Sequence, residues 1–363
     1  MLLYQIGLTL LPNIGYKLGK ELVSYCGGVE AVFKETKKNL EKIPGINARI
    51  AAKISKQNVL SRAEEEVRFI NDNNIKTFFY LDKEYPDRLK HCADNPILLF
   101  FKGDADFNVK RTISIVGTRK ATAYGKELCR KLVSNLTDYN VQIISGLAYG
   151  IDSCAHKQAV EEGISTIGVL GHGLDRLYPS SNYSLAKSML ANGGLLTEFL
   201  SGTIPDRENF PKRNRIVAGM SDAVIVVESG KKGGALITAD IANSYFRDVF
   251  AFPGRIGDMY SKGCNNLLKT NRAALIEDYH DLLYIMGWDK KSSQKVIQKK
   301  LFTELSEEEK IIIDLLTKNG TQTIDQLIIA TKIRSSKMAS LLLNLEFEDL
   351  IQCLPGKAYS VMC

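Results

Sequence analysis

The sequence predicts an α/β protein: an extended Rossmann-like, doubly wound, mostly parallel sheet with an N-terminal helical domain and a C-terminal winged helix. Three observations predict this fold. Short, apolar, β-branched runs alternate with helical patterns from residue 112 to about residue 287. Residues 1–70 show helical periodicity alone. The chain ends in three helical patterns followed by a hairpin.

These patterns divide the chain into four parts. We expect a helical domain of the helix-hairpin-helix or SAM type at 1–70 and the extended Rossmann-like domain at 71–287. A polar, lysine-rich stretch at 288–303 predicts a basic linker. Residues 304–363 are expected to form the winged helix-turn-helix domain.

The composition is that of an ordinary globular protein. The apolar fraction is 45% and the charged fraction 25% of 363 residues. No apolar run is as long as a membrane span, and the first residues lack the basic start of a signal peptide. The seven cysteines are odd in number and form no CxxC pair, which favours reduced thiols over a disulfide framework or a zinc site. We therefore expect a cytoplasmic protein without a membrane segment, metal or cofactor.

Positive charge is concentrated in the first 300 residues. The whole chain carries +7, whereas the residues from Leu301 onward hold six Lys or Arg and nine Asp or Glu. The remainder therefore carries +10. A basic body favours a polyanionic partner, although charge that only maintains solubility would explain the same count.

Two short turns, at 11–15 and 43–46, each join two amphipathic helical patterns in the N-terminal domain. Such turns resemble the helix-hairpin-helix module, whose backbone N–H groups hold a nucleic-acid phosphate. A helical packing domain that keeps the hairpin shape without this contact is the alternative interpretation.

Nine strands are expected. The apolar runs 76–81 and 97–101 flank a turn and a short helix at 85–90, and they predict an extra edge added to the main sheet. In a parallel sheet, ligands bind beyond the carboxyl ends of the strands, so the turns that follow the strands are the candidate site. The strand candidates of the main sheet are 113–116, 141–145, 165–170, 194–198, 223–227, 249–251 and 274–276.

The turn after the first main strand predicts an anion site. The strand stops at Gly117, where backbone can approach a ligand, and Thr118 and Arg119 follow before a helical pattern begins. Unpaired N–H groups at a helix N-terminus favour a phosphate. Glycines also follow the next two strands, in Ser145-Gly146 and at Gly171.

A dinucleotide enzyme and an acid–base enzyme are both disfavoured. Gly117 stands alone where the G-x-G-x-x-G fingerprint would be, and Ser145-Gly146 replaces the acidic residue that would hold a ribose. Asp152 and His156 are spaced i, i+4 on one helix, but no nucleophile elbow or metal-ligand spacing accompanies them. At a helix start, Asp152 is more typical of a cap.

The run from 209 to 215, expected at the end of a long loop, favours single-stranded nucleic acid. It holds three cations, two amides and an aromatic ring, and no acid. Cations neutralise phosphates, and Phe offers a stacking face to an unpaired base. Together with Arg119 it predicts one positive track along the carboxyl edge of the sheet. The run consists of Asn209, Phe210, Pro211, Lys212, Arg213, Asn214 and Arg215.

The last domain shows the signals of a winged helix. Ser306 precedes an acidic, apolar-periodic helix in capping-box style, a second helix covers 324–330, and a third starts near Arg334. Residues 350–361 predict the hairpin wing. Lys332, Arg334 and Lys337 would suit a DNA groove, whereas the acidic balance of the domain suits a protein partner, and both interpretations stay open.

The motifs occur in a fixed order that closely resembles the DprA family, also called Smf, the DNA-processing proteins of bacterial transformation. The resemblance covers residues 112 to 287. It is carried by Gly117-Thr-Arg with Tyr124-Gly125, Ser145-Gly-Leu-Ala-Tyr-Gly-Ile-Asp152, Ala155-His156, Gly171-His-Gly-Leu-Asp-Arg-Leu-Tyr-Pro179, Asn209-Phe-Pro-Lys-Arg-Asn-Arg215, Gly233-Gly-Ala-Leu-Ile-Thr-Ala239, Pro253-Gly254 and Gly263-Cys-Asn265.

The resemblance implies a protein that binds single-stranded DNA without hydrolysing it. Such proteins shield incoming strands, help to displace single-strand-binding protein, load RecA recombinase and form homodimers through the Rossmann-like domain. Thr118 replaces the more usual Ser of the family, and Tyr149 stands where many members have Arg. The implied DNA-contacting candidates are Gly117, Thr118, Arg119, Ser145, Gly146, Gly171, Asn209, Phe210, Lys212, Arg213, Asn214 and Arg215.

A LOG-type nucleoside-monophosphate phosphoribohydrolase is the alternative within the same fold class. Those enzymes carry a Pro-Gly-Gly-x-Gly-Thr-x-x-Glu turn. The equivalent segment here, 230–239, has no catalytic glutamate in register.

Overall fold

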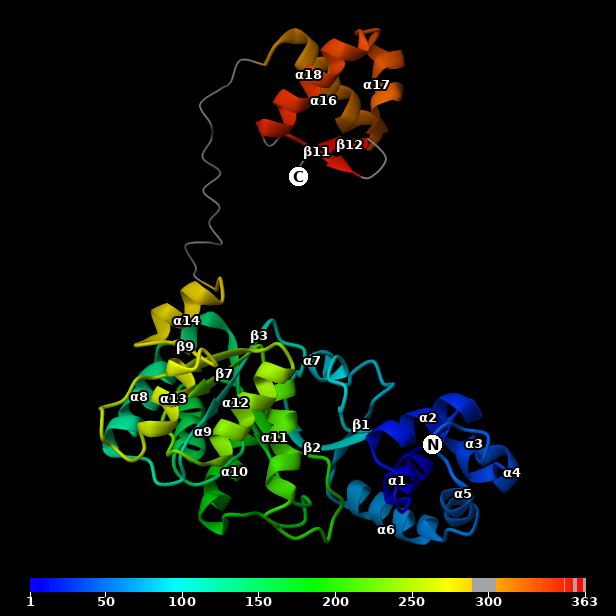
Figure 1. Cartoon of the computed structure of the whole chain (residues 1–363), viewed down its shortest axis with the longest axis vertical. Helices are drawn as coiled ribbons and strands as arrows, with labels where there is room; N and C mark the ends of the chain where they lie inside the picture. The colour runs from blue at the N-terminus through cyan, green and yellow to red at the C-terminus, as the bar shows by residue number, and fades with distance from the viewer. Residues whose placement is uncertain (289–304, 349, 355–357, 362–363) are drawn as a thin grey trace. The chain divides into compact units, whose positions relative to one another are not determined.

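The computed structural model describes residues 1–288, 305–348, 350–354 and 358–361. It forms two compact units, Met1–Trp288 and Asp289–Cys363 (Figure 1). The segment predicted as a basic linker lies, apart from Trp288, outside the described residues. Within the described part, no helix has the length and apolar character needed to cross a membrane.

The described residues of the first unit form a nine-stranded sheet in the order β1-β2-β6-β5-β4-β3-β7-β8-β9. Strands β3 to β9 run parallel, and β1 and β2 extend the sheet beyond β6 in antiparallel pairing. The predicted strands and the predicted extra edge are thereby confirmed. The bounds are β1 (Lys76–Phe79), β2 (Leu98–Asp104), β3 (Arg111–Val116), β4 (Val141–Ser145), β5 (Thr166–Val169), β6 (Gly193–Thr197), β7 (Ala223–Val226), β8 (Asp248–Ala251) and β9 (Ala274–Leu275).

Helices cover both faces of the sheet because successive strand residues point to opposite sides. In β3, Ile113 and Ile115 pack against one helical layer, and Val116 packs against the other. Burying each such side chain contributes about 1.5–3 kcal/mol to the stability of the fold. The first layer holds α8 (Ala123–Ser134), α9 (Ile151–Glu161) and α14 (Tyr279–Ile285), and the second holds α11 (Asn209–Gly219), α12 (Gly234–Ser244) and α13 (Lys262–Lys269). The short helix α10 (Tyr183–Met189) packs beside β5 and β6.

Strand order reverses beside β3, and this fixes where a ligand can sit. The chain steps from β3 through β4 and β5 to β6 on one side, then returns to place β7 on the other side of β3. The connections above β3 and β7 therefore leave in opposite directions and open a crevice at their carboxyl ends.

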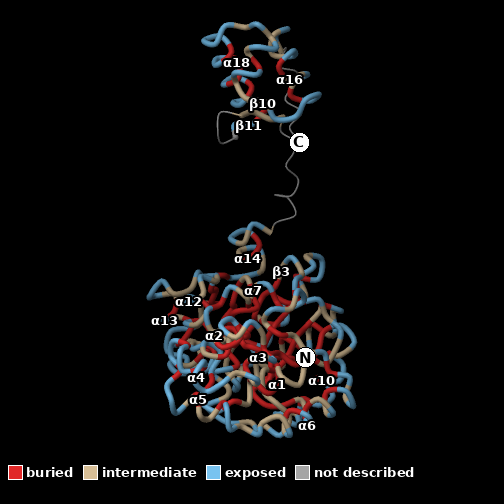
Figure 2. Tube along the Cα trace, turned by 90° about the vertical axis from the view of Figure 1, so that its right-hand side faces the viewer, coloured by how far each residue is buried: buried red, intermediate tan, exposed pale blue. Residues whose placement is uncertain are grey.

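The N-terminal helices share a core with the antiparallel edge of the sheet, beside β1 and β2 in Figure 1. Leu98 and Phe100 of β2 pack into the helical region, whereas Leu99 and Phe101 face the main core. Burial on both faces explains the unbroken apolar run of this strand. Figure 2 shows the buried residues gathered inside the first unit, with exposed residues around them. The helices are α1 (Leu2–Leu10), α2 (Tyr16–Cys26), α3 (Val29–Lys34), α4 (Lys37–Leu40), α5 (Ala48–Ser55) and α6 (Val59–Asp72), with α7 (Asp87–Lys90) between β1 and β2.

The second turn of the predicted helix-hairpin-helix type leads into α5. There the Asn47 side chain accepts hydrogen bonds from the N–H groups of Arg49 and Ile50. These are N–H groups that a phosphate at this turn would need, so the bonding favours the packing interpretation.

The C-terminal unit is a winged helix, as predicted. It consists of α16 (Glu307–Asn319), α17 (Ile324–Thr331) and α18 (Ser335–Phe347), with a sheet of β10 (Gln322–Thr323), β12 (Ala358–Val361) and β11 (Ile351–Leu354). The predicted capping box at Ser306 is present, with Glu309 as its partner. Lys337, proposed for a groove, forms an ion pair with Glu308 at 2.6 Å.

Candidate nucleic-acid interface

The basic run 209–215 forms the first two turns of α11, so its prediction as loop was wrong. Pro211 is the third residue of this helix. Proline is tolerated there because the first N–H groups of a helix have no intrahelical acceptor. The run is therefore rigid, and helical periodicity separates its side chains onto different faces.

One face of α11 points into a cavity and another points away from it. Phe210, Arg213 and Asn214 line the cavity, as i, i+3 and i+4 neighbours should. Arg215 instead forms an ion pair with Glu198, and its guanidinium lies 5.6 Å from the ring centre of Tyr16.

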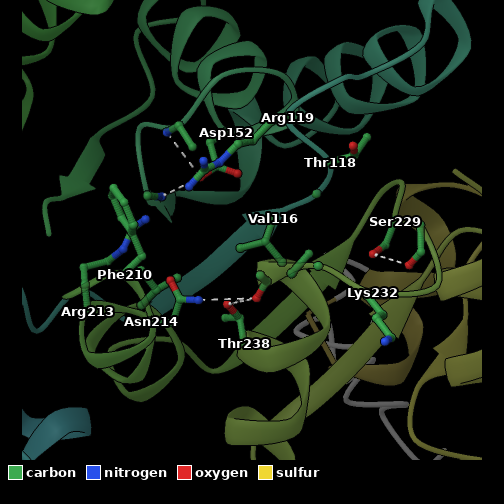
Figure 3. Close-up of a pocket in the computed structure, with 18 residues that line it drawn as sticks. Val116, Thr118, Arg119, Asp152, Phe210, Arg213, Asn214, Ser229, Lys232 and Thr238 are labelled. Carbon is green, nitrogen blue, oxygen red and sulfur yellow. Dashed lines mark hydrogen bonds between the residues drawn. The ribbon is translucent and has the colours of Figure 1, made fainter. Parts of the chain in front are cut away.

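The cavity has a volume of about 340 Å³ and lies beyond the carboxyl ends of β3 and β7. Its walls are the turns after β3 and β4, the first turns of α11, and the loop that leads into α12. Figure 3 shows Arg119 and Asp152 facing the α11 side chains, with Ser229 and Lys232 across the cavity. The sequence-predicted candidates that line it are Gly117, Thr118, Arg119, Gly146, Phe210, Arg213 and Asn214.

Arg213 forms part of the cavity wall and is held from within the chain. It is 4% exposed, and its Nη1 donates to the Val169 carbonyl oxygen at 2.6 Å. Burial lowers the pKa of Arg213 to about 10, against the opposing effect of Asp152. A Cβ on Gly146 would lie 1.9 Å from Nη1. Gly146 was predicted as a place where a ligand approaches the backbone. In the structure, the absence of a side chain there makes room for the Arg213 guanidinium.

Arg119 and Phe210 form a cation-and-ring pair at the mouth of the cavity. The exposed Arg119 guanidinium lies 5.2 Å from the ring centre of Phe210. The ring packs over Gly171, where a Cβ would lie 3.1 Å from a ring carbon. The ring of Tyr178 is 6.2 Å from that of Phe210. This arrangement offers a positive charge beside aromatic surface, as stacking on an unpaired base requires.

The opposite wall is suited to an anion. Helix α12 begins at Gly234 and has no side-chain cap, so its first N–H groups are open toward the cavity. A Cβ on Gly230 or Gly233 would meet no atom closer than 3.6 Å, so backbone is accessible there. Lys232 adds a positive charge to the same wall.

Some predicted candidates are not brought to the cavity. The Ser145 hydroxyl is buried and donates to the Ile115 carbonyl oxygen at 2.6 Å. The Asn209 side chain donates to the Ile204 carbonyl oxygen at 3.5 Å. Lys212 is exposed on α11 and, like Arg215, does not line the cavity.

Sequence reasoning missed the wall contributed by the segment after β7. The signal that could have predicted this wall is the run 230–234, which is rich in glycine and contains two lysines. It follows β7, the strand that pairs with β3, so it should lie at the same edge of the sheet. The lining residues missed there are Ser229, Gly230, Lys232, Gly233, Gly234 and Thr238.

Asp152 and His156 have structural partners. The Asp152 carboxylate accepts hydrogen bonds from the N–H groups of Gly146 and Ala148, and burial raises its pKa. His156 is fully buried, with Nδ1 2.7 Å from the Thr166 hydroxyl. Asp152 therefore supports the turn after β4, and His156 ties α9 to the start of β5.

His156 should make stability fall in mild acid. Burial, reinforced by the charge of Arg213, lowers its pKa from 6.5 to about 3. The unfolded chain then binds more protons than the folded chain below pH 6.5. The free energy of unfolding should accordingly fall by about 1.4 kcal/mol per pH unit from this residue as the pH drops. Urea unfolding of His156→Gln between about pH 6 and pH 5 should show a shallower slope than the parent chain.

The matched control for this prediction is His91→Gln, since His91 is exposed. Its pH slope should equal that of the parent chain. An unchanged slope in His156→Gln would show that His156 is not buried in its neutral form.

Comparison with known proteins places the chain in a family. The family model described as DNA recombination-mediator protein A matches residues 76–287, and the DprA winged helix domain matches residues 302–357. The chain belongs to the DprA family. The resemblance seen in the motifs is thus confirmed, and the LOG-type alternative is not favoured.

DprA relatives match in sequence and in structure. Protein Smf of Synechocystis is 31% identical, covering 98% of both chains. The X-ray structure of DprA from Streptococcus pneumoniae superposes with a TM-score of 0.68 at 31% identity, covering 78% of this chain and 98% of that one. The Helicobacter pylori DprA structure, from work on its single-stranded DNA binding mode, has a TM-score of 0.53 at 28% identity, covering 58% and 95%.

Proposed function

We propose that this DprA-family chain is a recombination mediator that binds single-stranded DNA and performs no chemical step on it. The observation that carries the proposal is the Arg119 guanidinium lying 5.2 Å from the Phe210 ring centre at the mouth of the cavity. A phosphate would bind Arg119, and the base attached to it would stack on the ring.

Three features support sequence-independent binding. Arg119 and Lys232 can neutralise phosphates from opposite walls, and the N-terminus of α12 offers backbone N–H groups on the wall that carries Lys232. The aromatic surface of Phe210 and Tyr178 accepts any base. Asn214 lines the cavity, and one N–H of its amide donates to the Gly234 carbonyl oxygen at 3.3 Å, which fixes the side chain against the start of α12.

We propose that the chain breaks no bond in the DNA because of how two titratable residues, Asp152 and His156, are bonded. The Asp152 carboxylate accepts two backbone hydrogen bonds, and His156 is buried against Thr166. Asp152 lines the cavity, but its carboxylate is engaged by the turn after β4, and His156 is buried against β5, so we infer that neither group acts in general acid–base catalysis.

The wider role follows from family membership. We propose that the chain shields incoming single strands during natural transformation or homologous recombination, loads RecA, acts together with single-strand-binding protein, and works as a cytoplasmic homodimer. Membership of the DprA family, shown by the matches to both of its domains, supports this role.

Fluorescence anisotropy with an oligothymidine of about 16 nucleotides tests DNA binding by the full chain. We expect micromolar or tighter binding that weakens steeply between about 50 and 200 mM salt, and weaker binding to duplex DNA. Lys212→Ala should reduce affinity modestly for all sequences alike, because Lys212 is exposed on α11 beside the cavity-lining Arg213.

Two outcomes would contradict the proposal. Binding that does not depend on salt would exclude a phosphate track. Release of a free base from a nucleoside monophosphate would instead favour the phosphoribohydrolase interpretation, which predicts that product.

A further inference from the structure

A second hollow lies on the other side of Arg119, between α8 and α9. Its volume is about 900 Å³, and Arg119 lines both this groove and the cavity. We call it the α8–α9 groove. Its cations are Arg119, Lys120, Lys126, Arg130 and Lys157, and its carboxylate is Glu161.

Positive charge in the α8–α9 groove is poorly neutralised. Glu161 lies 3.8 Å from Lys157. Among the described residues, no carboxylate lies within ion-pair distance of Lys126 or Arg130. Lys131, next to Arg130 on the same helix but outside the groove, is by contrast paired with Glu127 at 2.8 Å. The unpaired cations therefore gather on the face of α8 that lines the groove.

The α8–α9 groove adjoins the cavity at Arg119, which lines both. Helices α8 and α9 both begin next to the turn that carries Arg119, so Lys126 and Arg130 lie progressively farther from the cavity. Residues four apart on a helix are about 6 Å apart along its axis, which suits successive phosphates of an extended strand. Tyr149, 46% exposed, lines the groove and adds a stacking surface near Arg119.

We propose that the α8–α9 groove is a second segment of the DNA track, in which a single strand leaving the cavity at Arg119 runs with its phosphates on Lys126 and Arg130. This inference rests on the proposed function of the cavity. It predicts a site longer than the cavity alone can hold, with Tyr149 stacking a base between the two segments.

Oligonucleotide length separates the two segments. An oligothymidine of about 4 nucleotides should occupy the cavity, whereas one of about 16 should also fill the groove. The double variant Lys126→Ala, Arg130→Ala should weaken binding of the long oligonucleotide about tenfold. It should also lower the salt slope by about 1.4, since each phosphate contact on a single strand contributes about 0.7. Binding of the short one should not change. Lys131→Ala removes a charge from the same helix outside the groove and should leave both affinities unchanged.

Cys154 supplies a reporter that does not depend on affinity. Its thiol lines the groove, and Cys129 and the charge of Arg130 hold its pKa at about 7, which makes it reactive near neutral pH. The long oligonucleotide should slow alkylation of Cys154 in the full chain, and the short one should not. Cys26 lies in the N-terminal helices and should react at the same rate with either oligonucleotide.

The outcomes distinguish the inference from the proposed function. If the double variant binds the long oligonucleotide normally and Cys154 stays unprotected while DNA still binds, the groove proposal is overturned and the cavity proposal stands. Equal weakening of both lengths also overturns it, because the groove would then belong to the primary site. If the parent chain binds neither oligonucleotide, both proposals fail.

Discussion

Arg119→Ala is expected to weaken binding of single-stranded DNA by about 10- to 100-fold. Arg119 is the exposed cation that lines both the cavity and the α8–α9 groove, and its guanidinium lies over the Phe210 ring. The substitution would remove the proposed phosphate contact and the cation beside the Phe210 ring. The expected change corresponds to about 1.4–2.7 kcal/mol of binding free energy. Anisotropy titration with an oligothymidine of about 16 nucleotides measures it.

Two variants control this experiment. Arg119→Lys keeps the charge but loses the planar guanidinium, so its affinity should lie between those of the parent and the alanine variant. Lys110→Ala removes one exposed charge just before β3, at the end of the strand opposite the cavity, and should bind like the parent. If Arg119→Ala binds DNA with the same affinity as the parent chain, Arg119 does not contact the DNA and the prediction is wrong.

Gly146→Ala is expected to destabilise the first unit by about 3–5 kcal/mol. The new Cβ would lie 1.9 Å from Nη1 of Arg213. A long side chain could normally swing away, but Arg213 is buried and bonded to the Val169 carbonyl oxygen. Moving it breaks that bond and leaves a buried charge without its partner, which costs several kcal/mol. Thermal unfolding should occur roughly 10 °C lower.

Gly230→Ala is the matched control, because a Cβ at this position in the same cavity would meet nothing closer than 3.7 Å. Its melting temperature should stay close to that of the parent. A double-mutant cycle with Arg213→Met tests the cause directly. If the guanidinium is the obstacle, Gly146→Ala should cost much less in the Arg213→Met background. Equal costs in both backgrounds would mean that another contact is responsible.

The strands could be predicted because the buried strands consist of apolar, β-branched residues bounded by glycine turns. The residues of β3 show this most clearly, since Ile113, Ile115 and Val116 are buried on one face or the other. The extra edge was also predictable, because the run that forms β2 is apolar at every position from Leu98 to Phe101. The winged helix was predictable from its capping box at Ser306.

The site was predictable in part. Gly117 and Arg119 follow the central strand in sequence, so their place at its carboxyl end depends only on local order. The sequence did not predict which cations of the run 209–215 face the cavity, because the run was expected to be a loop. Once the run is helical, Arg213 turns inward and Arg215 turns toward Glu198, although both have the same side chain.

The sequence alone determined the order of the strands along the chain, the glycine turns and the family, because these depend on local pattern and on motif order. Only the tertiary structure decided which cations are free. The strand order β4-β3-β7 places the segment after β7 opposite Arg119, and α11 buries Arg213 while Lys212 stays in solvent. Burial and pairing depend on side chains far apart in sequence, so neither the charge nor the type of a residue shows whether it can meet a ligand.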